Sequence, residues 1–175
     1  TKGETYTKTV KSLNKSKFTR VIGYIGSLRE MEGVDLTAEA VSLLISQGHD
    51  VKLLALTSES GQAELQQYCD QLGLGENAVI TGPVPHDQVG PFYDLIDIFV
   101  ISRPDTMVSR IVTPLKPFEA MAMGKTVIAS RLPALEEIID DEKTGLLYQA
   151  DLVTSLCNAI SCCLNDQESV SYTHL

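Results

Sequence analysis

The sequence contains no run of apolar residues that is long enough to cross a membrane. A transmembrane helix needs about 18 consecutive, mostly apolar residues, and no stretch of this chain approaches that length. The printed sequence also shows no secretory signal peptide. We therefore expect a protein of the cytoplasm rather than one that is built into a membrane or exported.

Positive charge is scarce as well. The 14 lysines and arginines are outnumbered by 23 aspartates and glutamates, which gives a net charge of -9. A nucleic-acid surface needs an excess of basic side chains, so this balance argues against DNA or RNA as a partner. It does not exclude a small anionic ligand, because backbone amides and two or three basic side chains can decide the charge of one pocket.

Cysteine and histidine are too few and too scattered for a metal site. The four cysteines form no C-x-x-C pair, and none of the three histidines stands near them at ligand spacing. The neighbours Cys162 and Cys163 would point about 100° apart on a helix, which suits packing better than a disulfide. We expect reduced cysteines, no bound metal, and neither a Ser-His-Asp nor a Cys-His catalytic arrangement.

The chain does contain a regular alternation of short apolar runs and amphipathic segments. A length of 175 residues fits one domain, and 43% hydrophobic with 21% charged residues is typical of a soluble globular domain. The short runs predict strands, and the segments with a 3.6-residue period predict helices. The expected strands cover residues 20–25, 51–56, 78–81, 98–101, 126–129 and 144–148, and the expected helices cover residues 34–47, 62–72, 86–96, 114–123, 135–139 and 152–164.

This alternation predicts an α/β fold, a Rossmann-like doubly wound parallel sheet with helices on both faces. Continuously apolar strands are typical of parallel sheets that are covered on both sides. We expect the domain to span residues 19–166, after a polar linker or tail at residues 1–18. We expect residues 167–175 to be a disordered tail or an artefact of cloning. Because residue 1 is threonine rather than methionine, we expect a fragment or a processed piece of a longer protein.

The segment Thr113–Ser130 carries the strongest functional signal. Glu119 follows Lys116 by three positions, so both side chains can lie on one face of the first turn of a helix. A helix N-terminus with a lysine attracts an anion, whereas a carboxylate there is suited to accepting hydrogen bonds from sugar hydroxyls. The combination predicts a pocket for a nucleotide sugar.

A glycine-containing turn follows the first expected strand. Gly23, Gly26 and Gly33 do not have the G-x-G-x-x-G spacing, so a dinucleotide site is not favoured. The strand–turn–helix context nevertheless suits a loop that faces phosphate. In such a loop Gly26 can bring its backbone close to a ligand, Ser27 can donate a hydroxyl, and Arg29 can supply positive charge.

Two arginines flank the loop after the fourth expected strand. Ligands of open α/β sheets bind beyond the carboxyl ends of the strands, which is where this loop is expected to lie. Arg103 and Arg110 are therefore candidate phosphate contacts. The alternative for each is an exposed loop arginine with no role in binding.

Several stretches follow one another in an order that is known from one enzyme family. VIGYIGSLREMEGVDLTAEAV and VITGPVPHDQVGPFYDLIDIFV are followed by KPFEAMAMGKTVIAS and LPALEEIIDDEKTGLLY. Together, over about residues 20–165, they resemble the C-terminal, donor-binding half of GT-B glycosyltransferases of the GT4 type. The resemblance implies a domain that binds a nucleoside diphosphate sugar.

The resemblance also implies roles for single residues. Glu119 resembles the family glutamate that binds the ribose, and Lys116, in a P-L-K variant of the motif, would offset the charge of the diphosphate. We expect these two residues to serve catalysis as well as binding. Backbone N–H groups of Thr113 and Leu115 would add hydrogen bonds, and the loop at residues 83–86 would lie beneath the nucleobase.

The chain departs from the family pattern at three positions. Ser27 and Glu32 stand where many members carry arginine and lysine, and Ile111 stands where a first glutamate usually touches the transferred sugar. The sequence therefore does not identify the sugar, the base or the acceptor. Two alternatives also stay open: a non-catalytic nucleotide-binding module, and a GT-B-related sugar-nucleotide epimerase, for which His86 would be the acid–base candidate.

The implied reaction is transfer of a sugar to an acceptor hydroxyl with retained anomeric configuration. It would need neither a cofactor nor a metal, because no Asp-x-Asp pair is present to hold a cation at the phosphates. An N-terminal acceptor-binding domain would be missing from this chain, so the isolated fragment should be inactive. That half could associate peripherally with the cytoplasmic face of a membrane in the full-length protein.

Overall fold

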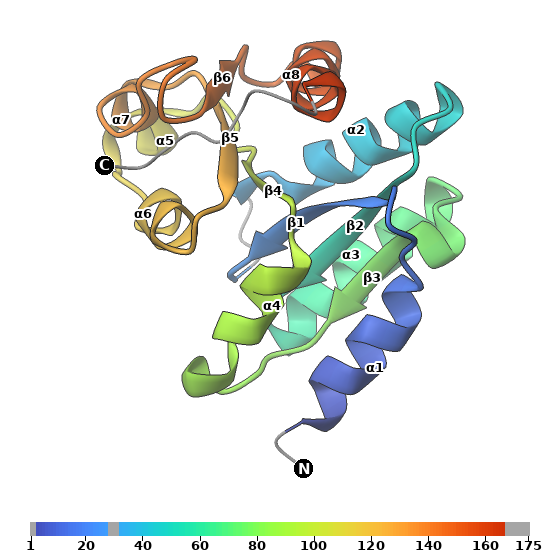
Figure 1. The fold of residues 1–175 in the computed structure, drawn as a ribbon. Helices are drawn as coiled ribbons and strands as arrows, with labels where there is room; N and C mark the ends of the chain where they lie inside the picture. Colours follow the sequence, from blue (N-terminus) through green and yellow to red (C-terminus); the bar gives the residue numbers. More distant parts are fainter. Residues whose placement is uncertain (1–2, 28–31, 167–175) are drawn as a thin grey trace.

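Six parallel strands form the central sheet of the computed structural model, which describes residues 3–27 and 32–166 (Figure 1). Their order across the sheet is β3-β2-β1-β4-β5-β6, and every neighbouring pair runs parallel. The strands are β1 (Arg20–Ile25), β2 (Val51–Leu56), β3 (Ala78–Thr81), β4 (Ile98–Ile101), β5 (Thr126–Ser130) and β6 (Leu146–Tyr148).

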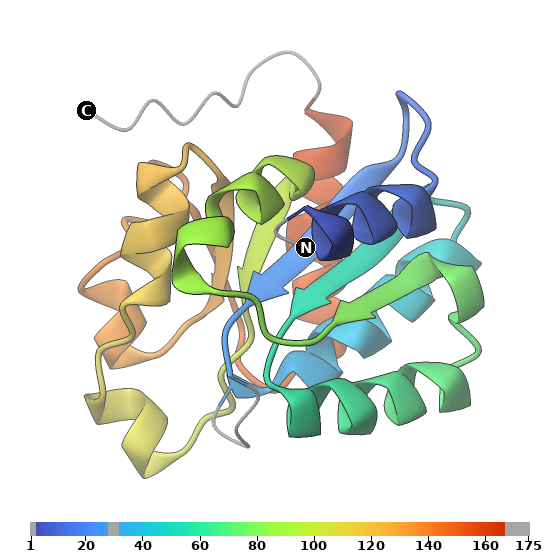
Figure 2. The same ribbon diagram turned by 90° about the horizontal axis from the view of Figure 1, so that it is seen from below.

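Helices cover both faces of this sheet. The helices α1 (Glu4–Leu13) and α4 (Gly90–Leu95) lie on one face, and α2 (Val34–Ser46) and α8 (Val153–Asn165) pack together on the other (Figures 1 and 2). Beside α2 lies α3 (Glu59–Gln71), α6 (Lys116–Ala122) contacts β4 and β5, and the short α5 (Met107–Ile111) contacts α7 (Pro133–Glu136). The predicted doubly wound, Rossmann-like fold is confirmed.

The central strands form the core, and their order sets where the loops at their carboxyl ends diverge. All residues of β2 and β4 are buried, as are those of β1 from Val21 onward, which requires helices on both faces. The strand order reverses between β1 and β4, because the chain builds outward from β1 on one side and from β4 on the other. Loops diverge at such a switch point and leave a crevice at the carboxyl ends of the strands, where open α/β sheets bind ligands.

Within the described residues, two α-helices are not predicted by the sequence pattern. Residues 4–13, expected to lie in a linker or tail, form α1, which buries Thr9 and Leu13 and packs Tyr6 edge-on against Phe92 at 5.5 Å between ring centroids. These inward-facing positions lie in an otherwise polar segment, so the tertiary contact rather than the local pattern stabilises the helix. The second is α5, whose five residues are too few to show a period.

Several expected boundaries shift at prolines. The helix expected at residues 86–96 is divided into a 3-10 turn at His86–Gln88 and α4, and α6 begins at Lys116 rather than at Pro114. The tail expected at residues 167–175 lies outside the described residues. Across the two described ranges, no helix is both long and apolar enough to span a membrane.

Candidate functional site

The candidate site lies where the loops after β1 and β4 diverge. Gly26 and Ser27 follow β1, and Ser102 and Arg103 follow β4, so all four stand at the carboxyl ends of the two strands at the switch point. The α6 segment follows from β4 on the same edge of the sheet. These positions place the turn after β1 and the 113–119 segment at one edge of the sheet, and the ligand contacts expected of their residues stay predictions.

Gly33 fixes the end of the first loop against β4. Its φ of 58° lies in the left-handed region, and a Cβ there would stand 2.1 Å from the carbonyl oxygen of Ser102, so only glycine fits. The Ser102 hydroxyl donates to the Gly33 carbonyl at 2.7 Å and accepts from the Thr37 hydroxyl at 2.8 Å. This chain of hydrogen bonds holds the start of α2 close to the switch point.

Lys116 and Glu119 form an ion pair on the first turn of α6. The Lys116 Nζ donates to Glu119 Oε2 at 3.0 Å, as their spacing of three predicts. Their side chains are 31% and 42% exposed, so both remain accessible to a ligand. The Lys116 Cε would stand 3.3 Å from a Cβ on Gly26, which places the stem of the lysine over the loop after β1.

Glu119 accepts a second hydrogen bond, from a donor that the sequence does not predict. The Tyr93 hydroxyl, on α4, donates to Glu119 Oε2 at 3.0 Å. Tyr93 is 4% exposed, and burial, followed by the nearby Glu119 charge, raises the pKa of its phenol well above the ordinary value. The phenol therefore stays protonated at neutral pH and acts as a hydrogen-bond donor. Its signal in the sequence is only that a buried tyrosine needs a partner for its hydroxyl.

Arg103 occupies a different position from the one expected of a phosphate ligand. It is 6% exposed, donates from Nη2 to Glu32 Oε1 at 3.1 Å and from Nη1 to the Val112 carbonyl at 2.9 Å. The Tyr24 hydroxyl donates to the other carboxylate oxygen of Glu32 at 3.2 Å. We call Arg103, Glu32 and Tyr24 the buried clamp, because they tie the first loop to the segment before α6. Within the described residues, the Nε of Arg103 has no hydrogen-bond partner.

The remaining candidate residues lie at the surface or outside the described residues. Arg110 is exposed and pairs with Asp105 at 2.5 Å from Nε and 2.8 Å from Nη2, and this contact holds the pKa of the Asp105 carboxyl below its ordinary value. The structure therefore places Arg110 in a local pair with Asp105, and its contact with a phosphate stays a prediction. Arg29 lies outside the described residues. The other exposed candidates are Ser27, Thr113 and Leu115.

A row of aromatic rings lies beneath the site. The Tyr93 ring stacks on Phe99 of β4 at 5.7 Å between centroids. The Tyr24 ring of β1 contacts the same Phe99, at 6.0 Å between centroids. The two phenol hydroxyls at the ends of the row each donate to one glutamate, Glu119 or Glu32. Tyr93 thus contacts the exposed ion pair, and Tyr24 is part of the buried clamp.

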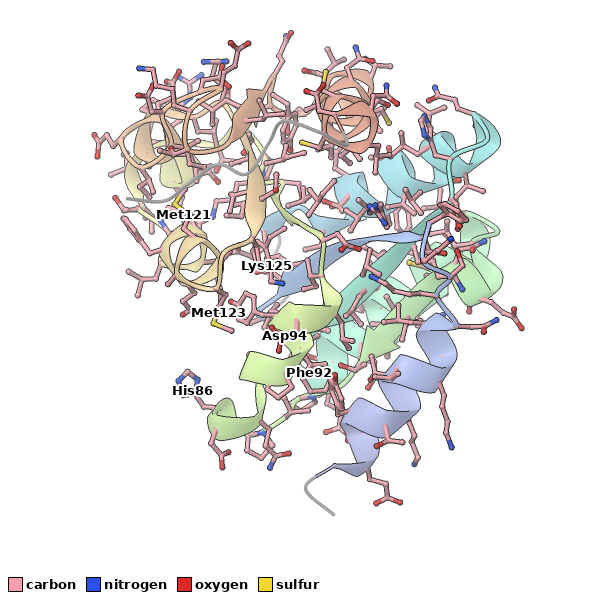
Figure 3. The ribbon with its side chains drawn as sticks, in the orientation of Figure 1. His86, Phe92, Asp94, Met121, Met123 and Lys125 are labelled. Carbon is pink, nitrogen blue, oxygen red and sulfur yellow. The ribbon has the colours of Figure 1, made fainter. Side chains whose placement is uncertain are left out.

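Other residues that the sequence analysis considered do not lie in the candidate site. The exposed side chain of His86 points away from α4 into solvent, and Met123 lies at the end of α6 (Figure 3). Met121 is partly buried against the core, in line with a packing role. Among the described residues there is no group of three or more His, Cys, Asp and Glu side chains that could hold a metal ion. Metal independence stays a prediction.

Comparison with known proteins identifies related sequences. A model of the family described as "Glycosyl transferases group 1" matches residues 19–166. The lipopolysaccharide core biosynthesis mannosyltransferase LpsB of Rhizobium meliloti is 26% identical over 168 residues, which cover 92% of this chain and 46% of LpsB. The D-inositol 3-phosphate glycosyltransferase of Corynebacterium urealyticum is 26% identical over 156 residues, which cover 85% of this chain and 36% of that enzyme. The chain thus spans less than half the length of these curated relatives.

Solved structures of low identity share the fold. A sucrose-phosphate synthase from Thermosynechococcus elongatus has a TM-score of 0.76 at 22% identity, over 91% of this chain and 40% of the synthase. Anabaena HepE, solved in complex with UDP-glucose, has a TM-score of 0.76 at 19% identity, over 97% of this chain and 45% of HepE. Because the family match covers most of the chain and the fold agrees, the resemblance drawn from the motifs is confirmed: the chain belongs to the group 1 glycosyltransferases.

Proposed function

We propose that this chain is the donor-binding domain of a retaining glycosyltransferase of the GT4 type, and that it binds a nucleoside diphosphate sugar. The observation that carries the proposal is the solvent-accessible Lys116–Glu119 pair, whose lysine stem lies over Gly26 at the β1–β4 switch point. A cation and a carboxylate side by side at this edge suit a ligand with a diphosphate and vicinal hydroxyls.

In this proposal Lys116 exchanges its partner when the donor binds. An ion pair between side chains that are 31% and 42% exposed is worth about 0–1 kcal/mol, because water screens it. A contact with a diphosphate carries more charge, so the ammonium group can turn from Glu119 to the phosphate at little cost. Glu119 is then left to accept hydrogen bonds from the ribose hydroxyls.

The same groups would assist the chemical step. As the bond between the sugar and the diphosphate breaks, negative charge grows on the leaving phosphate. A fixed lysine and backbone N–H groups near Thr113 and Leu115 would stabilise that charge without reorganisation. We propose that this requires no metal ion and that the anomeric configuration is retained.

A second domain is part of the proposal. The curated relatives are more than twice as long as the aligned region, which supports an acceptor-binding domain outside this chain. Such a domain would bring the acceptor hydroxyl to the open side of the donor site. We propose a cytoplasmic enzyme, whose other half could bind the cytoplasmic face of a membrane, with a role in polysaccharide biosynthesis.

One observation favours a second candidate function, a nucleotide-binding module without catalysis. Glu32 holds Arg103 inside the buried clamp, so this arginine is not directed at a phosphate. The exposed Ile111 offers no polar group to a sugar. A module of this kind would bind the nucleotide through Lys116 and Glu119 but would lack part of the machinery for transfer. The epimerase alternative gains no support from His86, which is exposed and points away (Figure 3).

Isothermal titration with UDP-glucose, GDP-mannose and ADP-glucose in the presence of EDTA tests the proposal. We expect one of the three to bind, and Lys116→Met to weaken that binding by roughly 1.5–3 kcal/mol, the value of a charged hydrogen bond. Lys125→Met is the matched control, because Lys125 stands beyond the opposite end of α6 (Figure 3). The absence of binding for all three donors, in EDTA and in magnesium, would contradict the proposal.

A further inference from the structure

Two donors meet on a single oxygen of Glu119. The Tyr93 hydroxyl and the Lys116 ammonium group both donate to Oε2, each at 3.0 Å. Within the described residues, Oε1 accepts no hydrogen bond, and the Glu119 side chain is 42% exposed. An ionised carboxylate can accept about four hydrogen bonds, so Oε1 remains available to hydroxyl donors of a ligand.

The two donors differ in how firmly they are held. Tyr93 is 4% exposed, and its ring stacks on Phe99 at an interplanar angle of 22°. Lys116 is 31% exposed on a flexible stem. A hydrogen bond from the tyrosine therefore has a fixed direction, whereas the lysine can leave without disturbing the core.

We propose that Tyr93 is a positioning residue, which fixes the Glu119 carboxylate so that Oε1 faces the ribose hydroxyls after Lys116 has moved to the diphosphate. This inference rests on the proposed function, because it assumes that a nucleotide binds at the site. Without the phenol hydroxyl, the departure of Lys116 would leave the carboxylate free to rotate. The ribose would then lose an oriented acceptor, although the phosphate contact would persist.

A purely structural role for this hydrogen bond makes a different prediction. The other end of the aromatic row provides the comparison, because Tyr24 donates to Glu32, whose side chain is only 11% exposed and is already paired with Arg103. A bond of that kind contributes to folding alone. If the bond from Tyr93 did only the same, its loss would change thermal stability but not the preference for a ribose.

The test measures that preference directly. The affinity ratio of UDP to 2′,3′-dideoxy-UDP is determined by titration calorimetry for the wild type and for Tyr93→Phe, which keeps the ring and removes the hydroxyl; if a different base is preferred, the GDP or ADP pair is used. We expect Tyr93→Phe to reduce the ratio by about threefold to tenfold, mainly through weaker binding of the ribonucleotide. The matched control is Tyr68→Phe, which removes a hydroxyl from Glu39 between α2 and α3 and should leave the ratio unchanged.

The outcomes separate this inference from the function on which it rests. A ratio in Tyr93→Phe that stays within about twofold of the wild type, with ribose preference intact, overturns the positioning role and leaves the proposed function standing. Failure of the wild type to bind any of the diphosphates overturns the proposed function and the inference with it. If Tyr93→Phe does not fold, 4-aminophenylalanine at position 93 provides the second test: it keeps a donor, so the ratio should be retained, and its loss overturns the role.

Discussion

At the scale of single residues, two glutamates have the same kinds of hydrogen-bond partner but differ in their exposure to solvent. Glu32 and Glu119 each accept from a tyrosine and a cation, but the side chain of Glu32 is 11% exposed and that of Glu119 is 42% exposed. Burial makes the first pair part of the fold, because a buried ion pair cannot exchange its partner without an uncompensated charge. Exposure leaves the second pair free to exchange with a ligand.

Glu119→Gln should weaken nucleotide binding and leave the domain folded. Replacing a charged acceptor of ribose hydroxyls costs roughly 1.5–3 kcal/mol, or about tenfold to 150-fold in Kd. Calorimetry with the preferred diphosphate measures the loss, and circular dichroism measures the fold. Glu137→Gln, at an exposed position directly after α7, should bind like the wild type. Normal binding by Glu119→Gln would assign Glu119 a structural role only.

Arg103→Met should destabilise the fold strongly. It leaves the Glu32 carboxylate buried without its cation, which typically costs about 3–5 kcal/mol. Urea denaturation gives the change in the free energy of unfolding, and replacing Glu32 by Gln in the same chain should recover part of it. Arg110→Met, which breaks only a surface pair, should show no measurable change. Equal effects of the two arginine replacements would refute the buried clamp.

Sequence patterns predict some of these residues and not others. The spacing of Lys116 and Glu119 places them on one helical turn, because spacing along a helix is a local property. The contacts of Arg103 with Glu32, 71 positions away, and of Tyr93 with Glu119 depend on how the loops meet in three dimensions. Arg103 and Arg110 have the same chemistry and similar loop positions, so only the fold separates the buried clamp from the surface pair.

At the scale of elements, strands and most helices follow from periodicity, and α1 does not. A continuously apolar strand can be recognised from its own residues, without knowledge of its tertiary contacts. The four strands β1 to β4 accordingly have the predicted bounds. The signal of α1 is weak because only a narrow stripe around Tyr6, Thr9 and Leu13 faces the protein. Its stability comes from β3 and α4, against which it packs.

Leu13→Ala should reveal that contribution. Leu13 is 1% exposed at the end of α1, and truncating a buried leucine to alanine typically costs about 2–5 kcal/mol. The midpoint of urea denaturation should fall accordingly. Val10→Ala, on the exposed side of the same helix, should change the free energy of unfolding by less than about 0.5 kcal/mol. If both variants unfold like the wild type, α1 is not part of the folded domain.

At the scale of the whole molecule, the candidate site lies at one edge of the sheet, and the chain spans less than half the length of its curated relatives. The switch point between β1 and β4 gathers the loop after β1, the loop after β4 and the start of α6 at one edge. The curated relatives extend well beyond the aligned region. Under the proposed function, binding of the donor and transfer of the sugar therefore depend on different parts of the full protein.

The 175-residue chain should bind a donor but not transfer its sugar. Without an acceptor-binding domain, nothing orients the acceptor hydroxyl, and slow hydrolysis of the donor is the most that we expect. An assay with radiolabelled donors compares the chain alone with a version extended by the upstream coding region. Robust transfer by the chain alone would contradict the proposed division of labour.

The central claim is that a nucleoside diphosphate binds at the β1–β4 switch point without a metal ion. Amide NMR spectra of isotopically labelled chain, titrated with UDP, GDP or ADP in EDTA, test it directly. We predict that at least one diphosphate shifts the amide signals of Gly26, Lys116 and Glu119, while those of Gly75 and Glu76, at the opposite edge of the sheet, stay in place. Unchanged spectra with all three nucleotides, or shifts that arise only at the opposite edge or only with added magnesium, would contradict it.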